Sequence, residues 1–531
     1  MPTTDMTTTM TGGQALVAAL EAHGVRVVFG IPGTHNLPIY SALADSEITH
    51  VLTRHEQGAG YAADGYARTT GAPGVVVTTS GPAILNAAAA AAQAYSDSIP
   101  VLLISPGLPL RHPGHGNGIL HEIKDQIGAM DAIVGHSQRV TSVAEIPLAV
   151  AQCFAAMTTG RPRPAFLEIP LDILDEIADV RVPGPVRGAV VAAREEDVTQ
   201  ARTLLTAAVA PMIIAGGGSS TASGPLKLLA EILGAPVITT TNGKGVLPES
   251  HPLSLGAGVH LPSVAKLVAE SDVVLAVGTE LAPSDFWYGP LEATGKLIRI
   301  DIDPTSIYTN GVPDVALVGD AAHTLDELID GMSRDPAADR AAQWRERLRA
   351  DSRAEGKNYL GIVEALAQAL DEDAIVVGDS TMACYYGAMA NLPLHRPRSF
   401  LYPTGVGTLG YGLPAAIGAK VAAGDRQVVA ILGDGGVMFT IAELAAAAEL
   451  RIALPVIVVD NGGYGEIRNE MADRADIVHA VDLAPIDFPA LAQTVGALGV
   501  GIESAEQLTA AVAKAFAADR PTIIHIRETS V

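Results

Sequence analysis

Residues 427–468, QVVAILGDGGVMFTIAELAAAAELRIALPVIVVDNGGYGEIR, constrain the fold more than any other stretch. An apolar run at 428–432 leads into a Gly-Asp-Gly turn and then into an alanine-rich segment of helical length at 437–450. A second β-branched run follows and ends in Asp-Asn-Gly-Gly. This order predicts one βαβ unit of a parallel sheet. Because both strands end at the same edge, Asp434 and Asn461 are expected to be neighbours.

The predicted edge has the chemistry of a metal-bridged diphosphate site. Glycines let backbone N–H groups approach an anion, and a helix N-terminus adds positive potential. An acid there repels a bare phosphate but becomes a ligand beside Mg²⁺, which prefers one or two carboxylates plus phosphate oxygens. Asp434, the Asn461 side-chain oxygen and a backbone carbonyl suit that role. The alternative is an ordinary turn, and the Asp-Asn-Gly-Gly-Tyr-Gly sequence 24 residues after GDG argues against it.

Length and composition narrow the class of protein. A chain of 531 residues is long enough for three or so domains, and 48% apolar with 4% aromatic residues suits closely packed α/β layers. The formal charge of −24 disfavours nucleic acid and anionic membrane surfaces as partners. Only Cys153 and Cys384 are present, so neither a disulfide framework nor a Cys-based zinc site is expected. Neither a secretory signal nor a membrane-spanning run is recognisable, so we expect a cytoplasmic protein.

Alternating strand and helix patterns predict an α/β protein with three doubly wound parallel-sheet domains, at 10–185, 196–335 and 357–531. Residues 74–106 repeat the order of β-run, Gly turn, alanine-rich helix and β-run, which predicts related topologies for the first and third domains. A shared βαβ pattern without common ancestry is the alternative. Ser80-Gly81-Pro82 takes the place of GDG in this first copy, so only the third domain offers a metal-binding acid.

The GDG stretch resembles the diphosphate-binding motif of thiamine-diphosphate enzymes, which runs GDG, a spacer and then Asn-Asn. The resemblance implies that Asp434 and Asn461 are Mg²⁺ ligands and that Gly463 provides a backbone carbonyl. Asp460 stands where the family has the first Asn of the Asn-Asn pair, which changes the local charge. Asn461 matches the second Asn, which is the implied metal ligand. The resemblance covers essentially the whole chain, as pyrimidine-binding, central and diphosphate-binding domains. The acetolactate synthase and 2-oxo acid decarboxylase branch fits best.

Arg54-His55-Glu56, followed by Gln-Gly-Ala-Gly, matches the position of the catalytic glutamate in this family. By this resemblance the Glu56 carboxyl group exchanges a proton with the aminopyrimidine ring of the cofactor, which then acts as an intramolecular base. The alternative is an acid that the dipole of a helix start stabilises.

Further residues are implied to contact the cofactor. The Gly407 carbonyl would accept from the 4′-amino group, and Leu409 would be the apolar wedge that bends the cofactor; a core leucine in a Gly-rich turn is the alternative. An ordinary helix cap is the alternative for the Asp-Ser-Thr loop of the third domain. The other implied cofactor contacts are Ser380, Thr381, Asp434, Gly435, Gly436, Asn461, Gly463, Tyr464 and Gly465.

Two histidines complete the expected catalytic set. A benzaldehyde-lyase-like pattern places a substrate-facing histidine at His35, and His121 falls where related enzymes have a glutamine near the reacting carbon. Proton transfer is the hypothesis for both, and satisfied or surface histidines are the alternative.

The resemblance implies a thiamine-diphosphate- and Mg²⁺-dependent lyase that decarboxylates a 2-oxo acid, with joining of the remaining unit to an aldehyde as a further activity. Gly-Thr-His-Asn, Leu-His-Glu-Ile, Gly-Thr-Glu-Leu with Asp-Phe-Trp, and Asp-Asn-Gly-Gly-Tyr-Gly-Glu-Ile-Arg are most similar to 5-guanidino-2-oxopentanoate (2-ketoarginine) decarboxylases. Glu280, Asp285 or Glu466 could pair with a guanidinium group, and solvated surface acids are the alternative.

The alternative functions are an acetolactate-synthase-type carboligase acting on pyruvate, a benzaldehyde-lyase-type carboligase, and a cofactor-binding or assembly protein without turnover. The presence of Glu56, Asp434 and Asn461 argues against the last. The family geometry implies a homodimer or homotetramer with the active site at the subunit interface. No motif demands FAD in the central domain, and we expect none.

Overall fold

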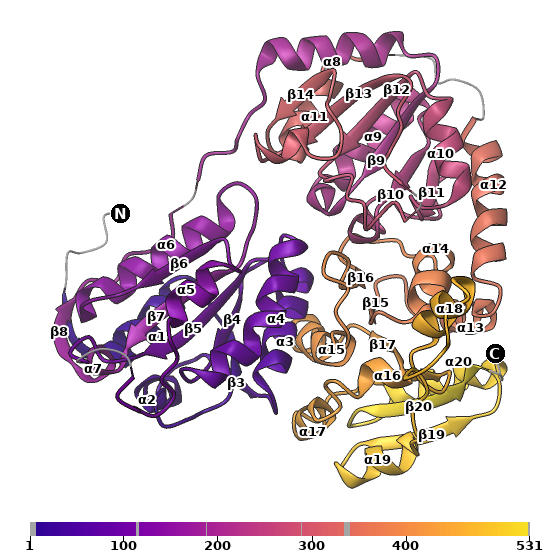
Figure 1. Ribbon diagram of the computed structural model, residues 1–531. Coiled ribbons are helices and arrows are strands. Elements are labelled where there is room, and N and C mark those ends of the chain that lie inside the picture. The colour runs from indigo at the N-terminus through magenta and orange to yellow at the C-terminus, as the bar shows by residue number, and fades with distance from the viewer. Residues whose placement is uncertain (1–6, 113–115, 187, 288, 334–339, 529–531) are drawn as a thin grey trace. The chain divides into compact units, whose positions relative to one another are not determined.

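The computed structural model describes residues 7–112, 116–186, 188–287, 289–333 and 340–528. These residues form three six-stranded parallel sheets flanked by helices (Figure 1), which confirms the predicted fold class. A short antiparallel pair, β1 (Thr8–Thr11) with β8 (Ile177–Val180), lies outside them. Among the described residues no helix is long and apolar enough to cross a bilayer.

The first compact unit comprises the described residues of Met1–Gly188, Gly405–Gly424 and Thr440–Leu450. Its sheet has the order β3-β2-β4-β5-β7-β6. The strands are β2 (Val27–Gly30), β3 (Thr49–Leu52), β4 (Gly74–Val77), β5 (Val101–Gly107), β6 (His136–Arg139) and β7 (Ala165–Pro170). The helices are α1 (Gly12–Ala22), α2 (Leu37–Ala44), α3 (Glu56–Thr70), α4 (Pro82–Ser96), α5 (Gln126–Asp131), α6 (Ile146–Thr158), α7 (Leu171–Asp175), α15 (Gly412–Ala423) and α17 (Glu443–Glu449).

Both faces of this sheet are buried, which explains why its strands are continuous apolar runs. Residues of α1, α2 and α6 pack with one face of the sheet, and residues of α3 and α4 pack with the other. All four residues of β4 and all seven residues of β5 are buried.

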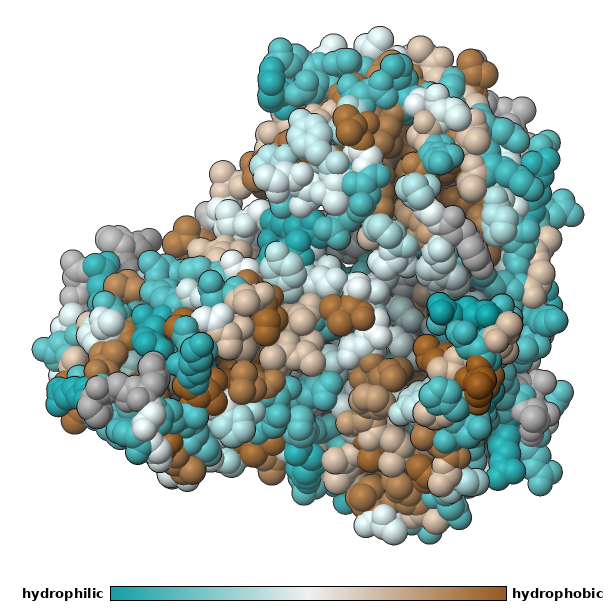
Figure 2. Space-filling model, viewed as in Figure 1, coloured by the Kyte–Doolittle hydropathy of each residue, from teal (hydrophilic) through white to brown (hydrophobic). Residues whose placement is uncertain are grey.

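The second unit comprises the described residues of Ala189–Thr404, Asp425–Phe439 and Arg451–Val531. Its first sheet has the order β11-β10-β9-β12-β13-β14. The strands are β9 (Pro211–Ala215), β10 (Val237–Thr239), β11 (Ser254–Ala257), β12 (Val273–Val277), β13 (Lys296–Asp301) and β14 (Val315–Val318). Helices α8 (Glu195–Ala207), α9 (Ser223–Leu233) and α11 (Ala321–Ile329) pack on one face, and α10 (Pro262–Ala269) and α12 (Arg340–Glu355) on the other. The outer surfaces of α8 and α12 are mainly hydrophilic (Figure 2).

The other sheet of this unit carries the GDG stretch and has the order β16-β15-β17-β18-β20-β19. The strands are β15 (Ile375–Gly378), β16 (Phe400–Leu401), β17 (Val428–Gly433), β18 (Pro455–Asp460), β19 (Leu498–Ile502) and β20 (Thr522–Arg527). The helices are α13 (Leu360–Ala369), the π-helix Ala383–Ala388, α14 (Met389–Asn391), α16 (Asp434–Val437), α18 (Gly465–Asp473), α19 (Phe488–Thr494) and α20 (Leu508–Phe516).

The sheets that contain β2 and β15 share one topology. Numbered by chain order within each sheet, both have the strand order 2-1-3-4-6-5, as the repeated sequence pattern predicts. The sheet that contains β9 has the order 3-2-1-4-5-6 instead. Open α/β sheets bind ligands where the strand order reverses, outside the carboxyl ends of the strands. That point lies between β15 and β17 in the sheet with the GDG stretch, and between β2 and β4 in its counterpart.

One helix predicted from the sequence is broken. Residues 437–450 were expected to be helical throughout, but α16 ends at Val437 and α17 begins at Glu443, with turns between them. Thr440 accounts for part of this break, because its hydroxyl donates to the carbonyl of Gly410 at 2.8 Å and its own carbonyl accepts from Glu443 N–H. A tertiary hydrogen bond thus overrides the helix propensity of the alanine-rich segment.

Helix α15 packs directly on α3 within the first unit because glycines face backbone at the crossing. A Cβ atom at Gly65 would overlap the carbonyl of Ala415, and one at Gly418 would overlap the carbonyl of Ala62. The absence of side chains at both glycines therefore sets the distance between the helices.

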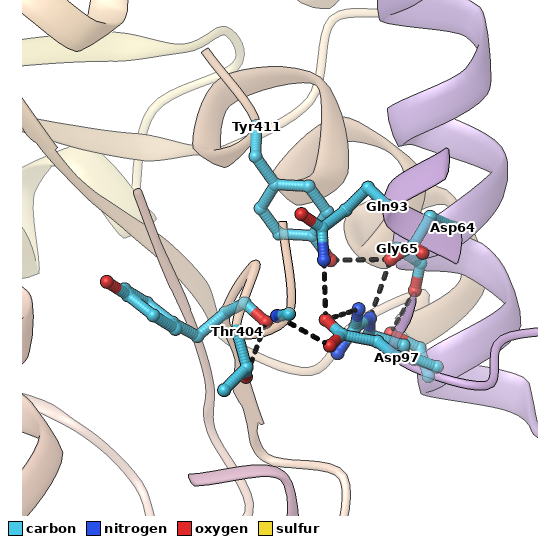
Figure 3. Close-up of polar contacts among 10 residues, drawn as sticks. Asp64, Gly65, Gln93, Asp97, Thr404 and Tyr411 are labelled. Atoms are coloured by element: carbon cyan, nitrogen blue, oxygen red, sulfur yellow. Dashed lines mark hydrogen bonds and ion pairs between the residues drawn. The ribbon is translucent and has the colours of Figure 1, made fainter. Parts of the chain in front are cut away.

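A buried polar network flanks this crossing (Figure 3). Asp64 accepts from the hydroxyl of Tyr411 at 2.6 Å and from Arg68 Nε at 2.6 Å. Arg68 also pairs with Asp97 at 2.7 Å, and Gln93 Nε2 donates to Asp97 at 2.7 Å. Burial raises the pKa of Tyr411, so its hydroxyl remains a donor. The network fixes the register of α15 on α3 by hydrogen bonds that only one alignment satisfies.

We expect Gly418→Ala to lower the free energy of unfolding by about 1–3 kcal/mol, because the new methyl group meets an immobile backbone carbonyl. Gly224→Ala in α9 is the matched control. Its methyl group would find no atom within 4 Å and should stabilise the helix by up to about 1 kcal/mol. Thermal unfolding of both variants tests this expectation, and equal melting temperatures would contradict the close-packing argument.

Candidate active site

The structure brings Asp434 and Asn461 together at the carboxyl ends of β17 and β18, as predicted. The backbone N–H of Asn461 donates to Asp434 Oδ1 at 3.3 Å. Burial raises the pKa of the Asp434 carboxyl, and the charge of Asp460 raises it further. Asn461 Oδ1 is also buried, and no donor among the described residues reaches it. A buried oxygen without a partner is costly, so this pair has the donor chemistry of a cation site.

The loop after β18 is held in one conformation by hydrogen bonds. Gly462 and Gly463 have φ angles of +77° and +143°, which other residues adopt at a cost. Arg468 donates to the carbonyls of Asn461 and Gly462 at 3.4 Å and pairs with Asp482 at 2.6 Å. The backbone N–H of Tyr464 donates to the carbonyl of Val481 at 2.8 Å, so the predicted metal loop is fixed from both sides.

Asp460, which departs from the family pattern, has partners of its own. One carboxylate oxygen accepts from the N–H of Gly462 at 2.9 Å, and the other lies 2.9 Å from His525 Nε2. Asp460 therefore stabilises the turn that presents Asn461.

The loop after β15 lies beside the glycine turn after β17. A Cβ atom at Gly433 would lie 2.9 Å from Thr381 Oγ1, and one at Gly436 would lie 3.6 Å from the Asp379 carboxyl group. Asp379 is fully buried and accepts from the N–H of Ser380 at 2.8 Å. A Cβ atom at Gly435 would lie 2.9 Å from the Tyr464 ring. These glycines keep open a cradle that other residues would fill.

A cavity of about 670 Å³ adjoins this cradle. Its lining includes Met382, Asp434, Asn461 and Gly465. Among the described residues no group of three or more His, Cys, Asp or Glu side chains could hold a metal ion. A mixed set of one carboxylate, one amide oxygen and backbone carbonyls is therefore the donor chemistry available here.

Glu56 is the first residue of α3 in the first unit. His55 caps this helix, because its ring Nδ1 accepts from the N–H of Gln57 at 3.1 Å. Asn86 Nδ2 donates to Glu56 Oε2 at 3.0 Å. Asn86 was not predicted as a site residue, because it belongs to no recognisable sequence motif. It lies one turn into α4.

Gly407 and Leu409 lie beside the same helix. The hydroxyl of Thr408, between them, lies 2.7 Å from the hydroxyl of Tyr61, which also accepts from Gln57 Nε2 at 3.1 Å. Gly407 has a φ angle of +64°, so the loop requires a glycine there.

His35 and His121 lie together, with ring centroids 4.7 Å apart. Ser80 links them, because its hydroxyl lies 2.6 Å from His35 Nδ1 and 3.4 Å from His121 Nδ1. Burial and the neighbouring His121 lower the pKa of His35. Ser80 was recognised only as part of a turn, and the repeat alignment with the GDG turn was the signal that marked its position.

Glu443 is a second buried acid that the sequence analysis missed. Its carboxylate accepts from the N–H of Arg54 at 3.0 and 3.1 Å and from the N–H of His55 at 2.9 Å. Burial raises its pKa to about 7, with Glu56 adding to the rise. Glu443 thus anchors the backbone that precedes Glu56.

The predicted site residues fall into both compact units. Glu56, His35, His121, Gly407 and Leu409 lie in the first unit. The second unit contains Ser380, Thr381, Asp434, Gly435, Gly436, Asn461, Gly463, Tyr464 and Gly465.

Comparison with known proteins agrees with this geometry. Residues 10–129, 198–328 and 377–526 match the N-terminal TPP-binding, central and C-terminal TPP-binding domains of thiamine pyrophosphate enzymes. The chain is 40% identical over 542 residues to "Probable 2-ketoarginine decarboxylase AruI" of Pseudomonas aeruginosa, covering 98% of this chain and 94% of that protein.

Other relatives carry the name of the alternative activity. The chain is 35% identical to "Probable acetolactate synthase large subunit" of Methanocaldococcus jannaschii, covering 97% of this chain and 92% of that protein. It is 32% identical to "Acetolactate synthase isozyme 1 large subunit" of Escherichia coli, covering 99% of this chain and 95% of that protein. With three matched domains and full-length relatives, the chain belongs to the thiamine-diphosphate-dependent enzymes.

Proposed function

We propose that this protein is a thiamine-diphosphate- and Mg²⁺-dependent decarboxylase of a 2-oxo acid, and that its substrate is 5-guanidino-2-oxopentanoate. The juxtaposition of Asp434 with the donor-free Asn461 Oδ1 carries the cofactor proposal. The name of the 40% identical relative supports the substrate, because 2-ketoarginine is this guanidino acid. The relatives named acetolactate synthase support an acetolactate-synthase-type carboligase as the second candidate.

The residues at the β17–β18 edge fit the cofactor. Asp434, Asn461 Oδ1 and the Gly463 carbonyl would hold Mg²⁺, and N–H groups of the glycine turn would face the diphosphate. When bound, thiamine diphosphate supplies a carbon nucleophile that stores the electron pair released as CO₂ departs. The other proposed cofactor contacts are Ser380, Thr381, Gly435, Gly436, Tyr464, Gly465, Gly407 and Leu409.

The acids and histidines of the first unit would handle protons. Glu56 would hold a proton at its carboxyl group, which Asn86 orients by its hydrogen bond. His35 is neutral near pH 7 because its pKa is lowered, so its ring can accept a proton as well as donate one. Ser80 fixes the rings of His35 and His121, which suits transfer of a proton to the reacting fragment. Glu443 would be a positioning residue for the loop before Glu56.

We further propose three domains at 10–185, 196–335 and 357–531, each holding one of the six-stranded sheets. The family geometry supports a homodimer or homotetramer in which two chains share each cofactor. A cytoplasmic location, which the sequence composition favours, completes the proposal. Active monomers in a sedimentation experiment would overturn the shared-site arrangement.

Release of CO₂ by the purified protein with thiamine diphosphate and Mg²⁺ tests the reaction. We expect 5-guanidino-2-oxopentanoate to be preferred over pyruvate, branched and aromatic 2-oxo acids. Glu56→Gln should lower kcat by about 10²–10⁴-fold, because it removes the ionisable carboxyl group. Glu47→Gln, at an exposed position, should leave kcat unchanged. Preference for pyruvate with acetolactate as product would replace this proposal by the synthase alternative.

Cofactor retention tests the metal site independently of turnover. Asp434→Asn and Asn461→Ala should each weaken Mg²⁺-dependent binding of thiamine diphosphate by at least about 10–100-fold. Asp473→Asn, at an exposed position at the end of α18, should bind as the wild type does. Isothermal titration with the cofactor at fixed Mg²⁺ measures this, and unchanged affinity in both site variants would place the metal elsewhere.

Stability against pH tests the burial of Glu443. A carboxyl group whose folded-state pKa is raised from 4.5 to about 7 loses stabilisation as the pH rises through that interval. Glu443→Gln removes the titration but keeps an acceptor oxygen. Between pH 4.5 and 8, the free energy of unfolding of the variant should therefore rise by up to about 3 kcal/mol relative to that of the wild type. Melting temperatures across this range measure the effect, and Glu372→Gln, which is exposed, should follow the wild-type curve.

A further inference from the structure

Glu466 combines one carboxylate oxygen that accepts a tyrosine hydroxyl with one that has no partner among the described residues. It lies in the first turn of α18, and its Oε1 accepts from the hydroxyl of Tyr386 at 2.7 Å. Its Oε2 is buried, and no donor among the described residues reaches it. Tyr386 therefore holds the carboxylate in one orientation and leaves one oxygen for a donor from outside the chain.

The tyrosine that binds this carboxylate belongs to a cluster of aromatic rings. Tyr385 and Tyr386 have ring centroids 4.7 Å apart at an interplanar angle of 75°. The Trp287 ring meets both nearly at right angles, with centroids 6.1 Å from Tyr385 and 5.8 Å from Tyr386. Burial raises the pKa of Tyr385, and the charge of Glu466 adds to this rise, so the two side chains are close. A corner of aromatic rings beside a carboxylate is a favourable site for a planar cation.

The backbone that carries these tyrosines is unusual. Tyr385 and Tyr386 lie in the π-helix Ala383–Ala388, and such short π-helical segments often occur at functional sites. Trp287 is anchored from the other direction, because its ring stacks on His260 at 3.9 Å, and His260 Nε2 lies 2.9 Å from Glu355. Trp287 remains 36% exposed, so this group of rings is open to solvent.

This aromatic corner adjoins the proposed metal site. Asn461 Nδ2 lies 3.6 Å from the sulfur of Met382, which directly precedes the π-helix. A Cβ atom at Gly465, the residue before Glu466, would lie 3.0 Å from the same sulfur and would overlap the Asn461 side chain. A ligand in the aromatic corner would therefore be next to the loop that presents Asn461.

The structure distinguishes Glu466 from the two other acids that the sequence offered as guanidinium partners. Glu280 and Asp285 each have interaction partners within the chain. Neither has a buried carboxylate oxygen without a partner, whereas Glu466 does.

We propose that Glu466, oriented by Tyr386 and flanked by Tyr385 and Trp287, binds the guanidinium group of the substrate and makes the enzyme selective for a cationic 2-oxo acid. The guanidinium N–H groups donate to Glu466 Oε2, and the aromatic faces contact its planar cation. The inference rests on the proposed decarboxylase function, and it specifies which residues select the substrate.

The test compares two substrates of the same shape and different charge. 5-Guanidino-2-oxopentanoate is cationic at its far end, and 5-ureido-2-oxopentanoate is its neutral isostere. In the wild type we expect kcat/KM to be at least about 100-fold higher for the guanidino acid. Glu466→Gln and, more weakly, Tyr386→Phe should lower this ratio to within a few-fold of one, mainly through the value for the guanidino acid. Glu470→Gln, one turn further along α18 and exposed, should keep the wild-type ratio.

Binding of 4-guanidinobutanoate, which has no 2-oxo group to react, gives a second readout without turnover. Isothermal titration should show this probe binding at least about ten-fold more weakly to Glu466→Gln than to wild type. Pentanoate, which has a carboxylate but no guanidinium group, is the reference. If Glu466→Gln does not fold, the affinity of Tyr386→Phe for the same probe can be compared with that of the wild type instead.

The outcomes separate the two proposals. Decarboxylation of no 2-oxo acid by the wild type would overturn the proposed function. Decarboxylation of the ureido acid as fast as the guanidino acid would overturn the inference and leave the decarboxylase standing. A wild-type preference for the guanidino acid that survives Glu466→Gln would show that another group binds the cation.

Discussion

A buried carboxylate and a buried amide oxygen at one sheet edge impose the constraint on which the rest of this structure depends. Asp434 follows β17 and Asn461 follows β18, and the two are joined by a hydrogen bond of 3.3 Å. Burial raises the pKa of the Asp434 carboxyl group, and no donor among the described residues reaches Asn461 Oδ1. Gly433, Gly435 and Gly436 keep the space beside them open. Arg468 and Asp460 hold the facing loop in place. This edge thus has the donor chemistry of a cation site beside an open glycine turn.

The first unit repeats the same strand order with different chemistry at the corresponding edge. Ser80 lies in the turn after β4, where the Ser-Gly-Pro sequence takes the place of GDG, and its hydroxyl lies between two histidine rings. One topology therefore supplies two kinds of edge, a cradle suited to a metal-bound diphosphate and a cluster suited to proton transfer.

Several residues with proposed roles in the site are held in place by other polar side chains. Asn86 holds Glu56, Glu443 holds the backbone before it, and Tyr386 holds Glu466. Each of these supporting groups comes from a segment far along the chain from its partner, except Asn86, which lies one helix away. Orientation by distant partners lets a site keep its geometry while its own loops remain rich in glycine.

The sequence by itself determined the fold class and the edge at which Asp434 meets Asn461, because strand and helix periodicity and the GDG spacing are local signals. His35 and His121 were singled out only by the family resemblance, and the structure places their rings together. The helix predicted at 437–450 is broken in the structure, because Thr440 bonds to the distant Gly410. The tertiary structure alone decided that Glu443 braces the Glu56 loop and that Glu466, not Glu280 or Asp285, has a carboxylate oxygen without a partner. Burial and long-range hydrogen bonds decide these features, and they depend on which segments meet in space, which no local pattern encodes.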